Sequence, residues 1–350
     1  MSEPADAGKA GRGGIAGSRL ADVMQGFGLG QASSVSYLPS GMMNRNWRVE
    51  TQQGVFALKE LVDVPVPKAR RSLDVLRALA ADGLPVCSPH LTPHGDSVLE
   101  VDERAYCLLP WAHGVHREGS SLTAEEAAEL GRLLGWTHQA LAASRTGLES
   151  PAGRPQARVT TPETAAAEAE RFLQLIAALD EPQTFDRAAA RALEQRKELL
   201  VAHADDRPGD EVPAGPVGWT HGDFQPLNLL WDNDHVSAIL DWDRLAVRPY
   251  GEEVVRTAQV QFTTSDGRLD LVLVAAFTAG YRAVVPLDDG DLADAVRRLW
   301  WKRASDFWQL QWHYDKGDHG PDELWVSGER LLHWWTPRRD QVTVAFTARR

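Results

Sequence analysis

The sequence predicts a two-lobed α+β protein, with a small antiparallel sheet in the N-terminal third and mainly helices after it. The chain has 350 residues, of which 43% are hydrophobic and 25% charged, a composition and length typical of a globular chain of about two domains. Short alternating segments separated by turn residues occupy residues 35–61. Beyond about residue 115, apolar residues recur mainly at helical spacing. Together these three observations give the fold class.

Charge and cysteine content exclude several classes of protein. The formal net charge is −12 and no run of Lys and Arg occurs, so nucleic acid is not an expected partner. The chain has two cysteines, and residues 1–19 contain no apolar segment of the signal-peptide type. The most apolar run, Leu271–Gly280, is about half of the ~20 residues that a membrane span needs. We therefore expect a soluble, cytoplasmic protein with no membrane partner.

The N-terminal lobe is expected to contain five strands and one helix. Ala69, Leu73, Leu76 and Ala80 share helical spacing and predict a helix over residues 67–81. The expected strands lie at residues 35–38, 47–51, 55–61, 97–101 and 105–109. The domain boundaries that follow are a disordered leader at 1–19, an N-lobe at 20–109, a hinge at 110–114 and a helical C-lobe at 115–350.

The C-terminal lobe begins its helices with recognisable capping residues. Thr123 followed by Glu126 forms a capping box, and Thr161-Pro162 places proline at the first helical position. A further helix is expected over about residues 186–202. Two short strands at 227–231 and 236–240 are expected to pair as a hairpin across Asp232-Asn233-Asp234, and the chain from Gly251 onward is expected to be helical.

The last fifty residues are rich in tryptophan. A helical stripe that includes Leu292, Val296 and Phe307 is flanked by Trp301, Trp308 and Trp312. Burial in the core is the default explanation, and a wall of a ligand pocket is the alternative. The acidic side chains in the loop that follows, at positions 315, 318, 322 and 323, are expected either to attract a cationic acceptor or to be solvated.

Residues 219–243 contain the most informative motif, W-T-H-G-D-F-Q-P-L-N-L-L-W-D-N-D-H-V-S-A-I-L-D-W-D. Asp223 precedes Asn228 by five residues, and the predicted hairpin returns the chain to Asp241. A carboxylate, an amide oxygen and a second carboxylate can therefore converge, which suits Mg²⁺ and phosphate. Asn228 and Asp241 would hold the metal ion, leaving Asp223 to accept the proton of an attacking hydroxyl.

A second motif, Val55-Phe56-Ala57-Leu58-Lys59, lies on a predicted strand. Ala57 and Lys59 point to one face of such a strand. The small Ala57 leaves room for a flat base, and Lys59 can reach nucleotide phosphates as a point charge. Upstream, Gly41 opens the loop G-M-M-N-R-N-W, where glycine permits close approach of the backbone to a phosphate.

The order G-x-x-N-R-N-W, strand lysine, H-G-D-x-x-x-x-N and D-W-D resembles the aminoglycoside phosphotransferase and choline/homoserine kinase family, a branch of the protein-kinase-like fold. The resemblance covers about residues 35–255 and implies a bilobal kinase that uses ATP and Mg²⁺ to phosphorylate a small hydroxylated acceptor. It implies Asp223 as the catalytic base, Asn228 and Asp241 as metal ligands, and Gly41, Asn46, Ala57 and Lys59 as nucleotide contacts. Residues 109–112 would form the hinge that binds adenine, with Leu109 and Trp111 as contacts. Because Pro110 has no N–H, the hinge donor would be Trp111 or Ala112.

The sequence departs from the family pattern at the partner of the strand lysine. The family places a glutamate on the single helix of the N-lobe, whereas the nearest carboxylate here is Asp74, with a shorter side chain. Asp74 is the expected partner of Lys59. A pseudokinase that binds nucleotide as a regulatory module is the alternative function, and the intact Asp223 and Asn228 favour an enzyme.

Three further polar residues have competing interpretations. Asp243 is expected to be either a second metal ligand or a structural acceptor. His221 is expected to brace its loop through a backbone hydrogen bond, with a hydrolytic His/Asp/Asp metal centre as the alternative. His138, on an otherwise apolar helix, is expected to be a structural histidine.

Overall fold

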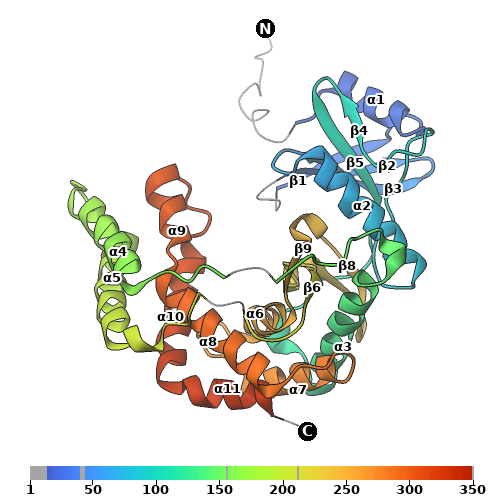
Figure 1. The fold of residues 1–350 in the computed structure, drawn as a ribbon. Helices are drawn as coiled ribbons and strands as arrows, with labels where there is room; N and C mark the ends of the chain where they lie inside the picture. The colour runs from blue at the N-terminus through green and yellow to red at the C-terminus, as the bar shows by residue number, and fades with distance from the viewer. Residues whose placement is uncertain (1–13, 40–43, 155–156, 211–212, 349–350) are drawn as a thin grey trace.

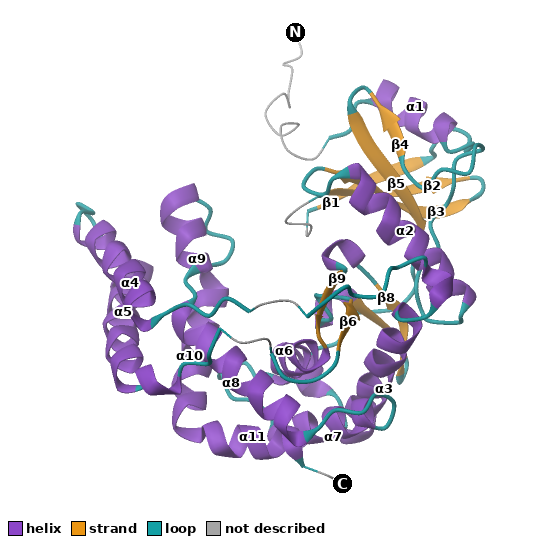
Figure 2. Ribbon diagram, in the orientation of Figure 1, coloured by secondary structure: helices purple, strands orange, loops and turns teal. Residues whose placement is uncertain are grey.

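The computed structural model describes residues 14–39, 44–154, 157–210 and 213–348. The chain forms two lobes, a small one built on a sheet and a larger one that is mainly helical (Figures 1 and 2). This arrangement confirms the predicted fold class. Helices α4 and α5 form a hairpin at the end of the large lobe that lies away from the small lobe (Figure 1).

The small lobe contains one antiparallel sheet of five strands, in the order β1-β2-β3-β5-β4. The strands are β1 (Ser34–Leu38), β2 (Arg45–Thr51), β3 (Gly54–Leu61), β4 (Leu99–Val101) and β5 (Arg104–Pro110). Helix α2 (Val66–Ala81) follows β3 and buries Ala69, Leu73 and Leu76, as the helical spacing predicted. In β3, Phe56 and Leu58 are buried on one face while Ala57 and Lys59 occupy the other.

Helix α1 (Gly17–Gly26) corrects the expected extent of the leader. Residues 1–13 lie outside the described part of the chain, but residues 17–19 already belong to this helix. It forms because Val23, Met24 and Phe27 are all buried, in one hydrophobic cluster with Trp47 of β2. The apolar face of α1 is too short for sequence periodicity to separate this helix from the Gly- and Ala-rich segment before it.

Most of the large lobe is helical. Its longer helices are α3 (Ala124–Leu141), α4 (Pro162–Ala177), α5 (Thr184–Ala202), α6 (Tyr250–Phe262), α7 (Leu271–Arg282), α8 (Asp289–Ser305), α10 (Asp322–Trp335) and α11 (Arg339–Thr347). The short helix α9 (Trp308–Leu310) continues into a π-helical turn at Gln311–Asp315. The two predicted caps are confirmed: Thr123 forms a complete capping box with Glu126, and Thr161 Oγ1 accepts the N–H of Thr164.

Four short strands that follow α5 in the chain position the catalytic motif. Strands β7 (Leu229–Asp232) and β8 (His235–Ile239) form the predicted hairpin, with Asn233 at a positive φ of 52° in the turn. Strands β6 (Val217–Thr220) and β9 (Ala246–Pro249) pair antiparallel and were not among the strands expected from the sequence. Residues 221–228 connect β6 to β7, and residues 240–245 connect β8 to β9.

Core packing accounts for most of the tryptophan-rich C-terminus. Trp300, Trp301, Trp325 and Trp335 are fully buried, whereas Trp308 and Trp312 are half-buried. In the part of the chain that the structure describes, no helix combines the length and apolar character that crossing a bilayer requires.

Candidate active site

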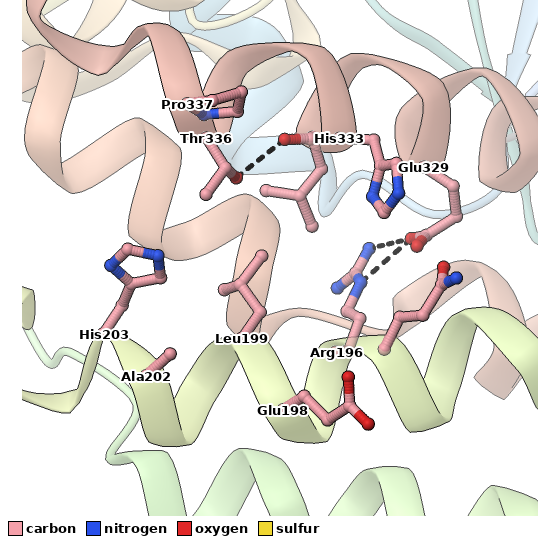
Figure 3. A pocket seen from close by; sticks show the side chains of 11 residues that line it. Arg196, Glu198, Leu199, Ala202, His203, Glu329, His333, Thr336 and Pro337 are labelled. Carbon is pink, nitrogen blue, oxygen red and sulfur yellow. Dashed lines mark hydrogen bonds and ion pairs between the residues drawn. The ribbon is translucent and has the colours of Figure 1, made fainter.

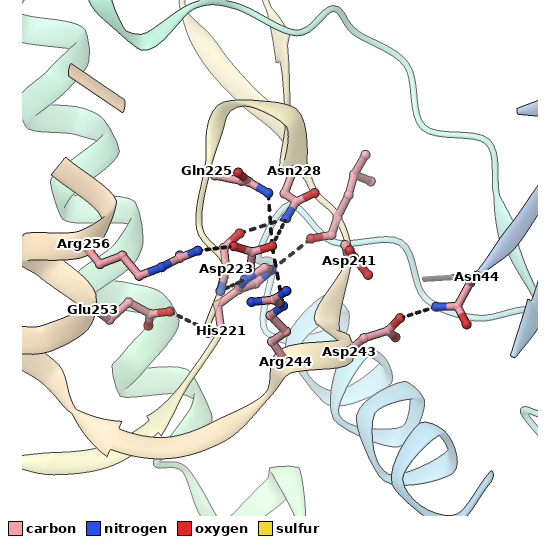
Figure 4. Close-up of polar contacts among 12 residues, drawn as sticks. Asn44, His221, Asp223, Gln225, Asn228, Asp241, Asp243, Arg244, Glu253 and Arg256 are labelled. Carbon is pink, nitrogen blue, oxygen red and sulfur yellow. Dashed lines mark hydrogen bonds and ion pairs between the residues drawn. The ribbon is translucent and has the colours of Figure 1, made fainter. Parts of the chain in front are cut away.

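The centre of the site is the loop that follows β6. Gly222 has a φ of 82°, and a Cβ atom at this position would lie 2.3 Å from the carbonyl oxygen of Arg244. Glycine is therefore required both by the left-handed backbone and by the close approach of the neighbouring segment. This turn directs the next residue, Asp223, toward Asn228, which lies just before β7 (Figure 4).

Two buried side chains hold this loop in place. His221 Nε2 donates to the carbonyl oxygen of Leu240 (2.9 Å), and His221 Nδ1 accepts the N–H of Asp223 (3.2 Å). Burial lowers the pKa of His221, so the ring stays neutral and keeps one nitrogen as an acceptor. The predicted bracing role of His221 is confirmed, and its two nitrogens are both engaged in structural hydrogen bonds.

Glu253, on α6, completes the support of the loop. One of its carboxylate oxygens accepts the N–H of Gly222, and Oε2 accepts from His138 Nε2 at 2.6 Å. Burial raises the pKa of Glu253, but the hydrogen bond from His138, the nearby His221 and the Gly222 N–H outweigh it, so the pKa lies below its usual value. His138 Nδ1 contacts the Tyr281 hydroxyl at 2.7 Å. The structural role predicted for His138 is confirmed.

Asp223 is surrounded by hydrogen-bond donors. Its Oδ1 accepts from Arg256 Nη2 at 2.7 Å, and its Oδ2 accepts from Gln225 Nε2 at 3.1 Å and from Asn228 Nδ2 at 3.3 Å. Arg244 Nε lies 4.0 Å from the same oxygen. These contacts, drawn in Figure 4, hold the carboxylate in a fixed orientation.

Asp241 and Asp243 bring the second half of the motif to the same place. Asp241 has a φ of 57° and a ψ of 71°, a left-handed conformation that costs an aspartate about 1 kcal/mol or more. The strained backbone turns the chain sharply after β8. Lys59 Nζ lies 3.2 Å from Asp241 Oδ1 and 2.5 Å from Asp243 Oδ2, so a lysine of the small lobe pairs with two carboxylates of the large lobe.

The electrostatics of this cluster follow from the pairing. Burial lowers the pKa of Lys59, but Asp241 and Asp243 outweigh that effect and hold the pKa above its usual value. Burial raises the pKa of Asp241, and Lys59 outweighs it in the opposite direction, so the pKa of Asp241 is lowered. Lys59 and Asp241 therefore both remain charged at neutral pH.

The partner expected for Lys59 is corrected. Asp74 lies on the exposed face of α2, where its carboxylate is 3.9 Å from Arg77 Nη1. The neighbours Leu73 and Val75 are buried, and a helix that buries those positions turns position 74 toward solvent. Asp241 and Asp243 take the place that Asp74 was expected to fill.

Asn44 is a further link between the lobes that sequence reasoning missed. Its Nδ2 donates to Asp243 Oδ2 at 2.7 Å, and its Oδ1 accepts the N–H of Val62 at 3.0 Å. The predicted Asn46 lies instead opposite Lys59 in the register of β2 and β3. Gly41, also predicted as a nucleotide contact, falls outside the described residues. Both asparagines belong to the sequence N-R-N. The sequence alone does not show that Asn44 contacts Asp243 while Asn46 pairs with Lys59 across β2 and β3.

The predicted hinge lies at the end of β5. Leu109 stands opposite Ala57 in the pairing of β3 and β5, which places both residues beside the expected base-binding face. The N–H of Trp111 donates to the carbonyl oxygen of Val55 at 3.0 Å. This hydrogen bond extends the sheet and occupies the Trp111 N–H. Of the two expected hinge donors, Trp111 is therefore excluded and Ala112 is left.

The donor set fits a magnesium ion. Asn228 Nδ2 donates to the carbonyl oxygen of Asp223 at 2.9 Å, which fixes the amide and directs its Oδ1 away from that contact. Within the described residues, no hydrogen bond to Asn228 Oδ1 is formed. The amide oxygen of Asn228 and the carboxylate of Asp241 are the hard oxygen ligands that Mg²⁺ prefers.

Two other features of the large lobe are separate from this site. A pocket of about 440 Å³ between α5 and α10 is lined by Arg196, Leu199, His203 and Glu329 among others, and shares no residue with the Asp223 loop (Figure 3). The acidic loop after α9 is already neutralised in part, because Asp315 forms two hydrogen bonds with Arg171, at 2.8 and 3.0 Å. The expectation that its carboxylates attract a cationic acceptor is therefore not supported for Asp315.

The fold and the site together define a phosphotransferase of the protein-kinase-like class. A sheet lobe contributes a strand lysine, and the H-G-D-x-x-x-x-N and D-W-D segments of the helical lobe meet it. Residues 34–287 match the phosphotransferase enzyme family. The chain belongs to this family, and the predicted class of small-molecule kinase with a hydroxyl acceptor is confirmed.

Curated relatives match over most of the chain. A homoserine kinase of Methylobacillus flagellatus is 24% identical over 326 residues, covering 91% of this chain and 93% of the relative. A homoserine kinase of Neisseria meningitidis serogroup B is 26% identical over 305 residues, covering 84% of this chain and 90% of the relative.

Solved structures share the fold at lower identity. A spectinomycin phosphotransferase in complex with ADP and spectinomycin superposes with a TM-score of 0.62 at 13% identity, covering 95% of this chain and 98% of that one. A microcompartment-associated aminopropanol kinase gives a TM-score of 0.57 at 17% identity, covering 91% and 97%. These structures confirm the bilobal kinase-like architecture.

Proposed function

We propose that this protein transfers the γ-phosphoryl group of ATP, with Mg²⁺, to the side-chain hydroxyl of a small amino acid of the homoserine type. The observation that carries the choice of acceptor is the arginine environment of Asp223. Arg256 contacts Asp223 directly at 2.7 Å, and Arg244 lies at 4.0 Å. The similarity to homoserine kinases over most of the chain supports the same class of acceptor.

The positive charge beside Asp223 favours an acceptor that carries a carboxylate. Arg256 uses one Nη atom on Asp223, and its side chain is 31% exposed, so further N–H donors can face an acceptor. Arg244 is 56% exposed beside the same carboxylate. An arginine can bind a carboxylate through two parallel hydrogen bonds. A purely cationic acceptor, such as an aminoglycoside, would instead meet like charge here.

In the proposed phosphoryl transfer, Asp223 and Lys59 have different roles. A bond forms between the acceptor oxygen and the γ-phosphorus while the bond from that phosphorus to the β,γ-bridging oxygen breaks, and ADP leaves. Asp223 orients the acceptor hydroxyl and accepts its proton, and Lys59 binds the phosphates. Because the transition state of phosphoryl transfer is loose, positioning and charge neutralisation provide most of the catalysis.

Asn228 and Asp241 are the residues that would hold Mg²⁺. When bound, the ion supplies charge neutralisation of the β- and γ-phosphate oxygens. Lys59 would then contact the phosphates while Asp243 keeps its hydrogen bond to Asn44. Ala57 and Leu109 would border the adenine, and the N–H of Ala112 would serve as the hinge donor.

The acceptor assignment is tested with a pair of substrates that differ only in the carboxylate. Initial rates of ADP release are compared for homoserine and for 3-aminopropanol, its decarboxylated analogue. We expect kcat/KM to favour homoserine. In Arg256→Gln the ratio of the two kcat/KM values should fall by about 10- to 150-fold, the equivalent of one charge-assisted contact of ~1.5–3 kcal/mol.

Arg256 also orients Asp223, and loss of that orientation would slow both substrates equally. The ratio of the two kcat/KM values therefore reports only recognition of the acceptor carboxylate. The matched control is Arg268→Gln, because Arg268 is an exposed arginine paired with Asp266. Equal kcat/KM values for the two substrates in the wild-type enzyme would refute the carboxylate assignment. Asp223→Asn should abolish turnover with either acceptor while affinity for ATP–Mg²⁺ stays nearly unchanged.

A further inference from the structure

A second cluster of polar side chains lies at the opposite end of the large lobe from the small lobe. It consists of His313 in the π-helical turn, His319 in the loop that follows, and Asp322 at the start of α10. The three residues offer ligand atoms that lie within 4.8 Å of one another. Among the residues that the structure describes, no other group of three His, Cys, Asp or Glu side chains meets that condition. We call this group the His313 cluster.

The distances within the His313 cluster match one face of a metal coordination tetrahedron. His313 Nδ1 lies 3.0 Å from His319 Nδ1 and 2.9 Å from Asp322 Oδ1, and His319 Nδ1 lies 3.6 Å from Asp322 Oδ2. Ligands bonded to zinc at about 2.0–2.1 Å in a tetrahedron are separated by about 3.3 Å. The three measured separations lie on both sides of that value.

Hydrogen bonds join two of the three pairs in the His313 cluster and leave the third, His319 with Asp322, without one. Both ring nitrogens point at the same carboxylate and at each other, and each neutral ring carries one N–H in total. If His313 Nδ1 donates its N–H to Asp322, His319 Nδ1 can accept from the same N–H at 3.0 Å, but its own distance of 3.6 Å to the carboxylate is too long for a hydrogen bond. A shared cation would satisfy all three ligand atoms at once.

The surroundings of His313 resemble the outer shell of a metal site. Its Nε2 faces Asp186 Oδ1 at 3.7 Å, and that carboxylate is fixed by the Tyr314 hydroxyl at 2.7 Å and the Gln183 N–H at 2.6 Å. The His313 ring also stacks on Phe185, with centroids 4.5 Å apart. At 3.7 Å the Asp186 carboxylate is beyond hydrogen-bond distance of the ring, so it contributes negative charge behind His313 while the stacking on Phe185 orients the ring.

We propose that His313, His319 and Asp322 bind a zinc-class divalent transition-metal ion, with water as the fourth ligand. Imidazole nitrogen favours such ions over Mg²⁺, which prefers oxygen. The open position faces solvent because His319 is 66% exposed. The ion would fix the loop 316–321 to the start of α10. Since Asp315 pairs with Arg171 of α4 and Asp186 belongs to α5, the same ion would stiffen the junction between the α4–α5 hairpin and the C-terminal helices.

Metal binding is measured on the full-length protein after treatment with a chelator. Zn²⁺ is titrated by calorimetry in the presence of saturating Mg²⁺, which occupies the oxygen ligands of the active site. Co²⁺ is added in a parallel sample, and its visible absorption bands report four-coordinate geometry. The variant is His319→Ala, chosen because this side chain is exposed and its removal leaves the core intact. His94→Ala, at another exposed histidine, is the matched control.

We expect one Zn²⁺ per chain, a rise in the thermal midpoint on binding, and tetrahedral Co²⁺ bands. His319→Ala should weaken Zn²⁺ binding by more than the roughly 10- to 100-fold that loss of an outer-shell partner costs, and should remove the thermal shift. His94→Ala should behave as the wild type. Zn²⁺ binding of equal strength in His319→Ala and the wild type, or no binding by the wild type, would overturn the proposal.

Discussion

Substitution of Asp243 distinguishes its two candidate roles. Asp243 Oδ2 accepts from both Lys59 Nζ at 2.5 Å and Asn44 Nδ2 at 2.7 Å, so the structure favours a carboxylate that joins the lobes. Asp243→Asn keeps a hydrogen-bond acceptor of the same shape but removes the charge. We expect it to lower the free energy of unfolding and to leave the Mg²⁺ requirement of turnover unchanged.

The magnitude follows from the exposure of the pair. A hydrogen bond between charged groups contributes about 1.5–3 kcal/mol when shielded from solvent. The side chains of Lys59 and Asp243 are 16% and 22% exposed, and Lys59 retains Asp241, so the lower end applies. A loss of ~1.5 kcal/mol corresponds to a fall of roughly 2 °C in the thermal midpoint for a chain of this size.

Urea unfolding and thermal unfolding of Asp243→Asn give the stability, and ADP release against Mg²⁺ concentration gives the metal requirement. Asp234→Asn, at an exposed carboxylate of the hairpin turn, is the control. Asn44→Ala should lower stability as well, and the double variant should lose less than the sum because the two residues share one contact. Unchanged stability with a roughly tenfold higher Mg²⁺ requirement would show that Asp243 is a metal ligand.

Three further outcomes are expected. Lys59→Ala should raise the KM for ATP and lower kcat, whereas Asp74→Ala should leave both unchanged, because Asp74 is exposed on α2; steady-state kinetics compare them, and a strong defect in Asp74→Ala would contradict the corrected pairing. The lowered pKa of Glu253 means that its contribution to stability is complete above its ordinary value of about 4.5 and disappears as the pH falls through the lower folded-state pKa. Thermal midpoints measured from neutral to acid pH should therefore fall less steeply in Glu253→Gln than in the wild type, while Glu252→Gln should follow the wild type; identical slopes in all three would count against the assignment. Thr123→Ala should lower the free energy of unfolding by about 1 kcal/mol through loss of the helix cap, and Thr123→Ser should retain the wild-type value. If urea unfolding gave the same free energy for Thr123→Ala and the wild type, the cap would not stabilise the protein.

Local patterns were sufficient to predict most elements of this fold. The alternation in residues 55–61 and the capping box at Thr123 depend only on neighbours in sequence, and both appear in the structure where expected. The strands β6 and β9 were missed because each has four residues and lies among glycine and proline. Their pairing joins segments about 30 residues apart, which periodicity within one segment does not reveal.

The site was predictable in its motif but not in its long-range partners. The spacing of Asp223 and Asn228 follows from one tight loop, whereas the contact of Arg256 with Asp223 depends on how α6 packs. The position of Asp74 could have been judged better from sequence. It is one residue from Leu73 on the predicted apolar stripe, about 100° around the helix, and so lies off the buried face of α2.

The pairing of Lys59 with carboxylates of the opposite lobe has a consequence for how a nucleotide enters. Separating the lobes would leave a largely buried ammonium group without its counter-ions, so electrostatics hold the two halves together even before a ligand arrives. An incoming triphosphate does not meet a bare positive charge. It exchanges with anions already present, while a metal ion arriving with the phosphates provides Asp241 with a new positive partner. Nucleotide entry is thus an exchange of ion pairs, and its dependence on ionic strength should be weaker than an unpaired lysine would give.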